Sequence, residues 1–520
     1  MVRASWGVAA AVRPRQPVDL RVGLPAWARA ALAFAALAAL CGCAVGPDFA
    51  PPPAPDVSGY TPEHLQRETV SAKDPAGKAQ VLFPGRDISG EWWRVFHSKG
   101  LTTLVKNAFE ANADLQAAQA ALRVARENYR AQQGLLFPSI DGNFSPTRQS
   151  VTNDFFGNPP DPRVFNLFTT QLNVSYVADV FGGTRRSIES LEALAEDQRF
   201  QLEATYLTLT SNLAGAAVQE ANLRGQIAAT QSIIKIESDL LDIVRRQRTL
   251  GQLAEADVAA QEATLAQAEQ ALPPLQKQLA QQRDLITALI GRLPSQQPKE
   301  RFFLSAMDLP RDLPLSLPSQ LVEQRPDVRQ AEANLHSASA LLGVAIANRL
   351  PNITLTADLG SAPFMIEKLF SPGYTFWTIA GSVTQPIFHG GQLMHQQRAA
   401  EAALEEAGAQ YRSTVITAFQ SVADALRALQ WDAVALQKAV DGEAAAARSL
   451  DIGRDRLRLG DIGVIALLPI QQTYQQALLT LVQARATRYA DTVALYQALG
   501  GGWWNRKDVE PEKTVLDFPQ

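Results

Sequence analysis

The sequence predicts a mainly α-helical protein with a small β portion, built from two copies of a helix–strand–strand–helix–helix unit. Long segments without proline carry apolar residues at heptad spacing, and two pairs of short segments alternate apolar and polar residues. Landmarks also recur in one order at offsets of 208 to 213 residues, far longer than a solenoid repeat of roughly 20–50 residues. The paired landmarks are Asp114 and Asp327, Pro138 and Pro351, Gly183 and Gly391, Gly251 and Gly460, and Ala288 and Ala498.

Residues 1–42 have the features of a secretion signal. The basic residues Arg21 and Arg29 precede an apolar run over 30–40, which ends in small residues. The sequence Leu-Cys-Gly-Cys43 resembles a bacterial lipobox, which predicts that Cys43 is lipidated and becomes the mature N-terminus. An ordinary signal peptide with incidental cysteines is the alternative. Both cysteines of the chain lie here, so the rest of the sequence has no disulfide and no cysteine metal site.

Composition narrows the classes of function. The formal net charge falls from −4 to −8 without the leader, because residues 1–42 carry five Arg and one Asp. This acidity argues against binding to nucleic acid, which favours a concentrated basic surface. No phosphate-binding loop or nucleophile motif is present, and the histidines, including His389 and His395, lack the spacing of metal ligands. The sequence therefore predicts neither an enzyme nor a metal site.

The elements follow in order along the chain. Residues 43–90 contain eight prolines and predict an extended tether. The first repeat, 91–291, has helical spacing over 101–133, strands from Ile140 and from Leu167, and a long helix over 184–248. Return helices are predicted over 255–272 and 275–290, separated by Pro273-Pro274. A proline-rich linker spans 292–320, the second repeat spans 321–500, and 501–520 form a C-terminal tail.

The strands of both repeats alternate strictly. One face carries apolar residues such as Leu172, Val174, Val180, Leu355, Ile379 and Ile387, and the other face carries polar residues such as Asn173, Asp179 and Thr354. A half-buried sheet in a soluble protein alternates in the same way. Aromatic residues near the strand ends, including Phe155 and Phe156, favour a membrane sheet with an apolar outer face. Because four strands cannot close a barrel, such a sheet requires an oligomer.

Two Leu-Gly pairs predict sharp reversals of the long helices. Leu250-Gly251 and Leu459-Gly460 each follow a long helix and precede a return helix, and glycine is the usual residue after a helix C-terminus. Both reversals lie one long helix away from the strands, which predicts a tip at the end farthest from the sheet.

These residues together resemble the TolC-type outer-membrane efflux factors, in the OprM- and NodT-like lipoprotein branch. Further matching motifs are Trp92-Trp93, Arg325-Pro326-Asp327, Gly343-Val-Ala-Ile-Ala, Pro386-Ile-Phe-His-Gly-Gly391 and Leu495-Tyr-Gln-Ala-Leu-Gly500. The resemblance implies a homotrimer whose strands close one transmembrane β-barrel, continued by a long periplasmic coiled-coil α-barrel. The proline-rich segments and both chain ends would pack around its waist. It also implies outer-membrane localisation with a lipid anchor, such as palmitate, at Cys43.

The implied function is that of the exit channel of a tripartite efflux system. Substrates would arrive from an inner-membrane pump of the resistance–nodulation–division class through a periplasmic adaptor, and the channel itself would hydrolyse nothing. One alternative is the outer-membrane duct of type I protein secretion, with an ATP-driven partner. Another is a periplasmic coiled-coil scaffold lipoprotein whose alternating segments are soluble hairpins.

The resemblance also places an aperture at the periplasmic tip, where Leu250, Gly251, Leu459 and Gly460 would contact the adaptor. In the lipoprotein branch, a hydrophobic ring and an aspartate ring close this end. Alignment from Gly460 puts the hydrophobic position at Ile465, whereas the aspartate position holds Pro469, which departs from the family pattern. The candidates to replace that ring are Asp257, Asp461 and Asp455; for each, a solvated surface carboxylate is the alternative.

Overall fold

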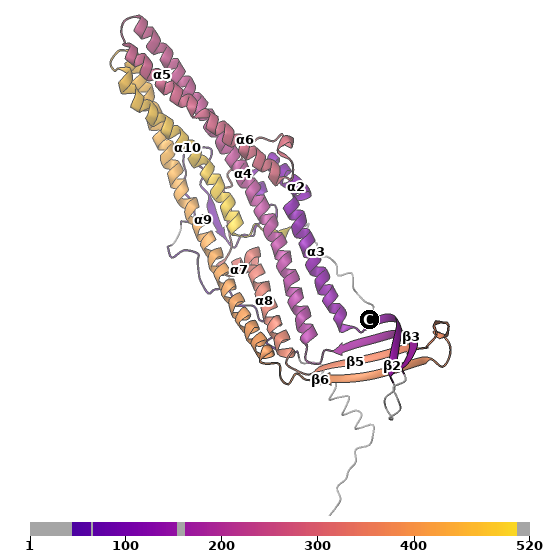
Figure 1. The fold of residues 1–520 in the computed structure, drawn as a ribbon. Coiled ribbons are helices and arrows are strands. Elements are labelled where there is room, and N and C mark those ends of the chain that lie inside the picture. The colour runs from indigo at the N-terminus through magenta and orange to yellow at the C-terminus, as the bar shows by residue number, and fades with distance from the viewer. Residues whose placement is uncertain (1–43, 64–65, 153–161, 507–520) are drawn as a thin grey trace, which may run out of the picture.

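The computed structural model describes residues 44–63, 66–152 and 162–506. The chain is elongated, with a four-stranded sheet at one end and the reversals of the long helices at the other (Figure 1). Cys43, the predicted lipidation site, lies outside the described residues, as do Phe155 and Phe156.

Both halves contain the predicted helix–strand–strand–helix–helix order. The first half consists of α2 (Lys99–Ala111), α3 (Ala113–Gln133), β2 (Ser139–Thr152), β3 (Pro162–Ala178), α4 (Gly183–Thr249), α5 (Glu255–Gln270) and α6 (Leu272–Leu289). The second half consists of α7 (Pro318–Gln324), α8 (Pro326–Ala347), β5 (Asn352–Ser361), β6 (Thr375–Thr384), α9 (Gln392–Arg458) and α10 (Val464–Ala498). Short 3-10 turns, including η1 (Trp92–Phe96), η2 (Gly134–Leu136) and η6 (Trp503–Asn505), join or follow these elements.

The segment 101–133, where the sequence shows helical spacing, forms two helices, α2 and α3, that meet at Asn112. The Asn112 side chain accepts a hydrogen bond from the Leu115 N–H at 2.9 Å and caps α3. Its amide also donates to the Leu289 carbonyl oxygen at 3.0 Å, which joins this break to the end of α6.

The two long helices, α4 and α9, have the same length of 67 residues, roughly 100 Å at 1.5 Å per residue. Each begins after a left-handed glycine, with φ of 76° at Gly182 and 87° at Gly391. These caps are 209 residues apart, so the sequence alignment of Gly183 with Gly391 was wrong by one position. Among the described helices, none carries an apolar stretch of the length needed to cross a membrane.

The same offset continues through the return helices. Gly251 and Gly460, which follow α4 and α9, are 209 residues apart, as are Gly291 and Gly500, which follow α6 and α10. The alignment of Ala288 with Ala498 was therefore also one residue out of register. The two halves differ in length only before Gly182 and Gly391, in the region of the strands and their loops and in the opening helices α2 and α7, which have 13 and 7 residues.

The four strands form one antiparallel sheet in the order β2-β3-β5-β6. Its central pair, β3 and β5, joins the two halves of the chain. β2 and β6 lie at the edges, and within the described residues neither has a second strand beside it. The sheet therefore ends in two open edges that can pair with further strands.

The waist of the molecule contains the main core. Trp92 of η1 is 1% exposed and stacks on Tyr496 of α10 with ring centroids 5.3 Å apart. The proline-rich segment before η1 packs here as well, because its strand β1 (Val81–Pro84) pairs in parallel with β4 (Asp312–Leu315) of the linker. The tether and the linker are thus part of one packed body.

A buried polar cluster ties this waist together. The fully buried Arg488 of α10 donates to the side-chain oxygen of Gln80 at 2.7 Å. Gln80 in turn donates to the hydroxyl of Thr492 and to the Pro310 carbonyl oxygen, both at 3.0 Å. Next to Arg488, Asp491 shares a hydrogen bond with Asp432 of α9.

We expect Asp491→Asn to stabilise the protein at alkaline pH. Burial, with the hydrogen bond and charge of Asp432, raises the pKa of Asp491 to about 8, so the folded state favours the protonated carboxyl. This contribution to stability is fully present below the ordinary aspartate pKa and is lost as pH rises through about 8. Thermal unfolding of the variant should therefore show a higher Tm than the parent at pH 9 and a much smaller difference at pH 5.

The exposed Asp239 of α4 supplies a matched control for this experiment. Asp239→Asn should shift the Tm little at either pH, because the group is solvated. A gain of equal size at pH 5 and pH 9 for Asp491→Asn would contradict the assigned titration.

Candidate functional site

The two faces of the sheet differ in polarity along every strand. One row across the sheet consists of Ile140, Val174, Ala357 and Ile379, and the adjacent row consists of Asp141, Asn173, Asp358 and Thr378. In the polar row, the Asn173 amide donates to the Asp358 carboxylate at 2.6 Å and accepts from Asn143 at 3.0 Å. The predicted alternation is confirmed, and a hydrogen-bonded polar face runs across the strands of both halves.

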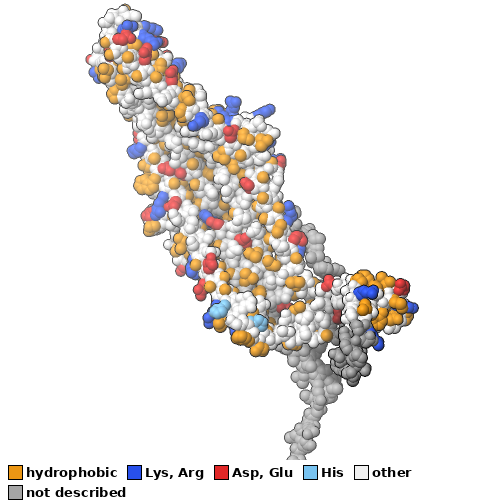
Figure 2. Space-filling model, viewed as in Figure 1, with side chains coloured by type: hydrophobic (Ala, Val, Ile, Leu, Met, Phe, Trp, Pro, Cys, Tyr) orange, Lys and Arg blue, Asp and Glu red, His pale blue; other side chains and the backbone are white. Residues whose placement is uncertain are grey.

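The apolar face of the sheet is uncovered in the isolated chain. Ile379 is 76% exposed, and Leu172 and Leu355 are also exposed. Figure 2 shows hydrophobic side chains gathered over the sheet, at the end opposite the helix reversals. A continuous exposed apolar surface of this kind marks contact with a membrane or another protein.

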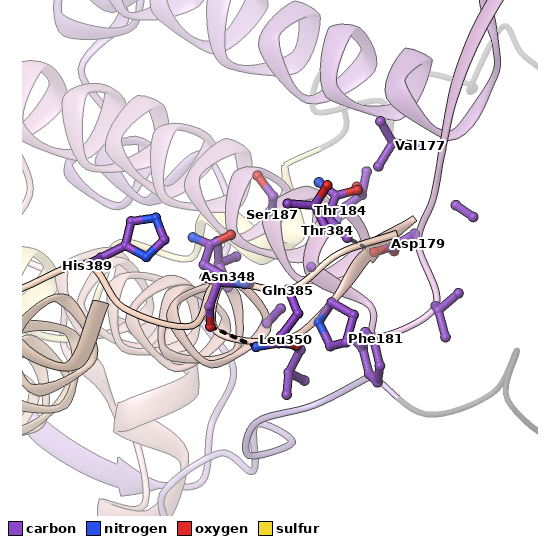
Figure 3. Close-up of a pocket in the computed structure, with 18 of the residues that line it drawn as sticks. Val177, Asp179, Phe181, Thr184, Ser187, Asn348, Leu350, Thr384, Gln385 and His389 are labelled. Atoms are coloured by element: carbon purple, nitrogen blue, oxygen red, sulfur yellow. Dashed lines mark hydrogen bonds between the residues drawn. The ribbon is translucent and has the colours of Figure 1, made fainter. Parts of the chain in front are cut away.

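An open hollow of about 870 Å³ lies where the sheet meets the helices (Figure 3). Val177, Asn352 and Thr384, which belong to the polar face, line it together with the ends of α3, α4 and α8. The hollow therefore continues the polar face toward the helices. His389 lines its rim, and His395 lies against Gly391.

Asp179 is a structural residue of this hollow that the sequence assigned to the polar face of a strand. β3 ends at Ala178, and the Asp179 carboxylate accepts hydrogen bonds from the Thr184 and Arg185 backbone N–H groups, both at 2.9 Å. An aspartate shortly before Gly-Gly-Thr was the available signal for such a cap, since carboxylates favour helix N-termini. Val180 and Ile387, predicted as strand residues, likewise lie in the joints beyond β3 and β6.

The two reversals at the far end have the same geometry. Gly251 and Gly460 both have φ of 75°. The Gly251 N–H donates to the Arg248 carbonyl and the Gln252 N–H to that of Gln247, at 2.8 and 2.9 Å. After α9, Gly460 and Asp461 repeat both hydrogen bonds, to Leu457 and Arg456. This is the six-to-one and five-to-two pattern of a Schellman motif, which places a left-handed glycine at a helix end.

The side chains next to these glycines point into solvent. Leu250 and Leu459 are 73% and 83% exposed. Ile465, the second residue of α10, is 69% exposed. Pro469 lies inside α10 and does not end it. The predicted contact residues Leu250 and Leu459 and the predicted aperture residue Ile465 therefore all present exposed apolar side chains at the tip.

The candidate aspartates at the tip all have partners. The Asp257 carboxylate accepts from the Ala254 backbone N–H at 3.0 Å, at the start of α5. Asp461 pairs with Arg456 at 2.6 Å, and Asp455 pairs with Arg458. These contacts give each carboxylate a structural role in a helix reversal. Charged side chains of both signs gather at this end of the molecule (Figure 2).

Below the tip, a buried carboxylate joins the two helical hairpins. Glu237 of α4 is 1% exposed and accepts hydrogen bonds from the amides of Gln261, Gln471 and Gln475. Burial raises the pKa of Glu237, although the glutamine hydrogen bonds lower it in part. Because Gln261 lies on α5 and the other two lie on α10, this cluster couples the first hairpin to the second.

Within residues 44–63, 66–152 and 162–506, no three His, Cys, Asp or Glu side chains come together as a metal site. The distinctive features are the two-faced sheet, the hollow beneath it and the paired reversals.

The comparisons with known proteins agree with this architecture. The sequence model described as "Outer membrane efflux protein" matches residues 104–292 and 317–501. The chain is 29% identical over 434 residues to the pyoverdine export outer membrane protein OpmQ of Pseudomonas putida, covering 82% of this chain and 90% of that one. It is 27% identical over 487 residues to the toluene efflux pump outer membrane protein TtgC of P. putida, covering 92% and 97%.

A solved structure extends the similarity to the whole fold. The outer-membrane channel OprN superposes with a TM-score of 0.79 at 26% identity, covering 89% of this chain and all of that one. The two matched segments of the family model coincide with the two halves of the fold, from α2 to α6 and from α7 to the end of α10. The chain belongs to the outer membrane efflux protein family.

Proposed function

We propose that three copies of this outer-membrane efflux protein assemble around one axis and close a twelve-stranded β-barrel. The observation that carries the proposal is the four-stranded sheet with one exposed apolar face, one polar face and two open edges. In lipid, every backbone N–H and C=O group needs a partner. The outer edge of β2 in one copy would therefore pair with that of β6 in the next.

Closure of the barrel would form a conduit for substrates. The apolar faces would contact lipid and the polar faces would line a water-filled lumen, as in other membrane barrels. The hollow beneath the polar face would connect this lumen to the space enclosed by the long helices of three copies. Substrates would pass passively, and no residue is assigned a catalytic role.

We infer that the channel receives its substrates from an inner-membrane pump of the resistance–nodulation–division class through a periplasmic adaptor. The support is the similarity to TtgC, which is named as part of a toluene efflux pump. The exposed Leu250 and Leu459, with Gly251 and Gly460, would contact the adaptor at the end farthest from the membrane. Recovery of adaptor and pump with a tagged chain tests this inference, whereas recovery of an ATP-driven partner would favour type I secretion.

A periplasmic scaffold lipoprotein explains the sheet poorly. That function would leave Leu172, Leu355 and Ile379 in water, at the cost of roughly 25 cal/mol for each Å² of apolar surface. The barrel places the same side chains in lipid.

The aperture is assigned to Ile465 for a specific reason. Asp257, Asp455 and Asp461 are engaged in a helix cap or ion pairs, whereas Ile465 is exposed and has an apolar side chain near the reversal. Three isoleucines around the axis would form an apolar constriction, which resists the passage of water and ions when narrow.

Arginine on the apolar face should prevent stable insertion of the barrel. Ile379→Arg is expected to lower the free energy of unfolding by roughly 2–4 kcal/mol, because the charge would lie near the bilayer midplane. Thr378→Arg is the matched control: Thr378 directly precedes Ile379 in the same strand but lies on the polar face, so arginine there should be tolerated. Heat-modifiable trimers counted on gels measure both effects; equal losses for the two variants would contradict the assignment of the faces.

Ile465→Ser should widen the resting aperture and raise the single-channel conductance in a planar lipid bilayer. The reason is that serine removes most of the apolar side chain from the proposed constriction. Ile416→Ser offers a matched control, since Ile416 is also 69% exposed but lies on α9 away from the tip. If the Ile465→Ser channel conducts like the parent, Ile465 does not form the constriction.

Cys43 should carry covalent lipid at the mature N-terminus. One acyl chain gives marginal membrane binding, so several chains together with the barrel would hold the protein firmly. Mass spectrometry of the purified protein should find a lipidated N-terminal peptide beginning at residue 43, and Cys43→Ser should abolish it. An unmodified N-terminus at any other residue would refute this anchor.

A further inference from the structure

The first described residues occupy a cradle at the sheet end of α4 and α8. The Val45 N–H donates to the Phe181 carbonyl oxygen at 3.0 Å. The Arg186 guanidinium donates through Nε to the Val45 carbonyl oxygen at 3.1 Å and through Nη2 to the Asp48 carboxylate at 2.6 Å. We define residues 44–49 as the strap.

Arg186 is an unusual residue for this position because it is 4% exposed. Its Nη1 also donates to the Glu189 carboxylate at 2.7 Å, so the cation lies between a strap carboxylate and a helix carboxylate. Glu189 in turn contacts His336 of α8 at 3.0 Å, and the ring of Phe49 stacks on His336 with centroids 4.3 Å apart. Losing the strap would remove two acceptors of the Arg186 guanidinium, the Val45 carbonyl oxygen and the Asp48 carboxylate.

Two glycines allow the strap to lie directly on the helices. A Cβ on Gly46, whose φ is 95°, would lie 2.5 Å from the Gly343 Cα. A Cβ on Gly343 would in turn lie 2.9 Å from both the Arg186 Cγ and the Val45 carbonyl oxygen. This close contact gives a physical reason for the glycine that opens the motif Gly343-Val-Ala-Ile-Ala, since any larger residue there would displace the strap from the helices.

The strap ends at the boundary of the sheet. Ala44 lies against Gly182, the glycine with left-handed backbone that precedes α4. This contact is in the short joint between β3 and α4, directly after the end of the sheet. Consecutive Cα atoms are 3.8 Å apart, so a group on residue 43 is tied within one residue of this joint. Without the strap contacts, the next long-range hydrogen bond along the chain is that of Tyr60 to the Ser316 carbonyl oxygen at the waist. That free segment would reach roughly 50 Å when extended, at about 3.3 Å per residue.

We propose that Arg186 is the positioning residue for the lipid anchor: it clamps the strap so that acyl chains on Cys43 enter the membrane beside the apolar face of the same chain. This inference rests on the lipidation of Cys43 proposed above. A clamp of this kind replaces a long flexible tether by a short one, which raises the effective concentration of the acyl chains at the sheet.

Hydrogen–deuterium exchange on the full-length protein in detergent tests the clamp directly. Arg186→Ala should speed exchange of the Val45 amide by roughly tenfold or more, because hydrogen bonds to charged groups are worth more than neutral ones. Gly46→Val should do the same from the strap side, without changing any residue of the helices. Arg130→Ala removes an exposed Arg–Glu pair of α3 and should leave the exchange of Val45 unchanged. Unchanged exchange of the Val45 amide in both Arg186→Ala and Gly46→Val would overturn the clamp.

A double-mutant cycle with Cys43→Ser tests the positioning role. In the lipidated protein, Arg186→Ala and Gly46→Val should each lower the yield of heat-modifiable trimers in the outer membrane. In the Cys43→Ser background, neither should lower it further, because there is no anchor left to position. An additional loss of equal size in that background would show that Arg186 acts on the fold, and would overturn the proposal. Mass spectrometry separates this result from a failure of lipidation itself, which would remove the anchor along with any need to position it.

Discussion

The equal length of the two long helices is the constraint on which the rest of this structure depends. α4 and α9 start at the same sheet and must reverse at the same level, because their return helices share one tip. From Gly182 to Gly291 and from Gly391 to Gly500, the two halves match residue for residue. One extra residue in either helix would turn every later side chain by about 100°. Differences in length lie before Gly182 and Gly391, in the strand region and in the opening helices α2 and α7.

Polar contacts between distant segments of the chain hold this arrangement at several levels. At the waist, Arg488 and Gln80 join α10 to the proline-rich segment, and the carboxyl groups of Asp432 and Asp491 meet between α9 and α10. Below the tip, Glu237 is surrounded by glutamine amides from two other helices. Buried polar groups of this kind fix one register, since a slip would leave each of them without its partners. The tip is therefore held by specific contacts as well as by apolar packing.

The sheet relates the fold to the function. Its polar face continues into the hollow above the helix ends, while its apolar face and open edges remain without partners in the described part of a single chain. The strap adds a further element on the same end, because it brings residues 44 and 45 to the joint beside that face. The proposed membrane contact, conduction and lipid anchoring would thus meet at one joint between sheet and helices.

The sequence by itself determined the repeat, the strand faces and the helix reversals, because these depend on local periodicity and on glycines such as Gly251 and Gly460. The roles of Ile465 and the tip leucines stay predictions, and the sequence did not show which aspartates are engaged in caps and ion pairs. Only the tertiary structure decided the burial of Glu237 and the clamp of Arg186. Each of these depends on atoms brought together from distant parts of the chain, and periodicity along one segment carries no information about such partners.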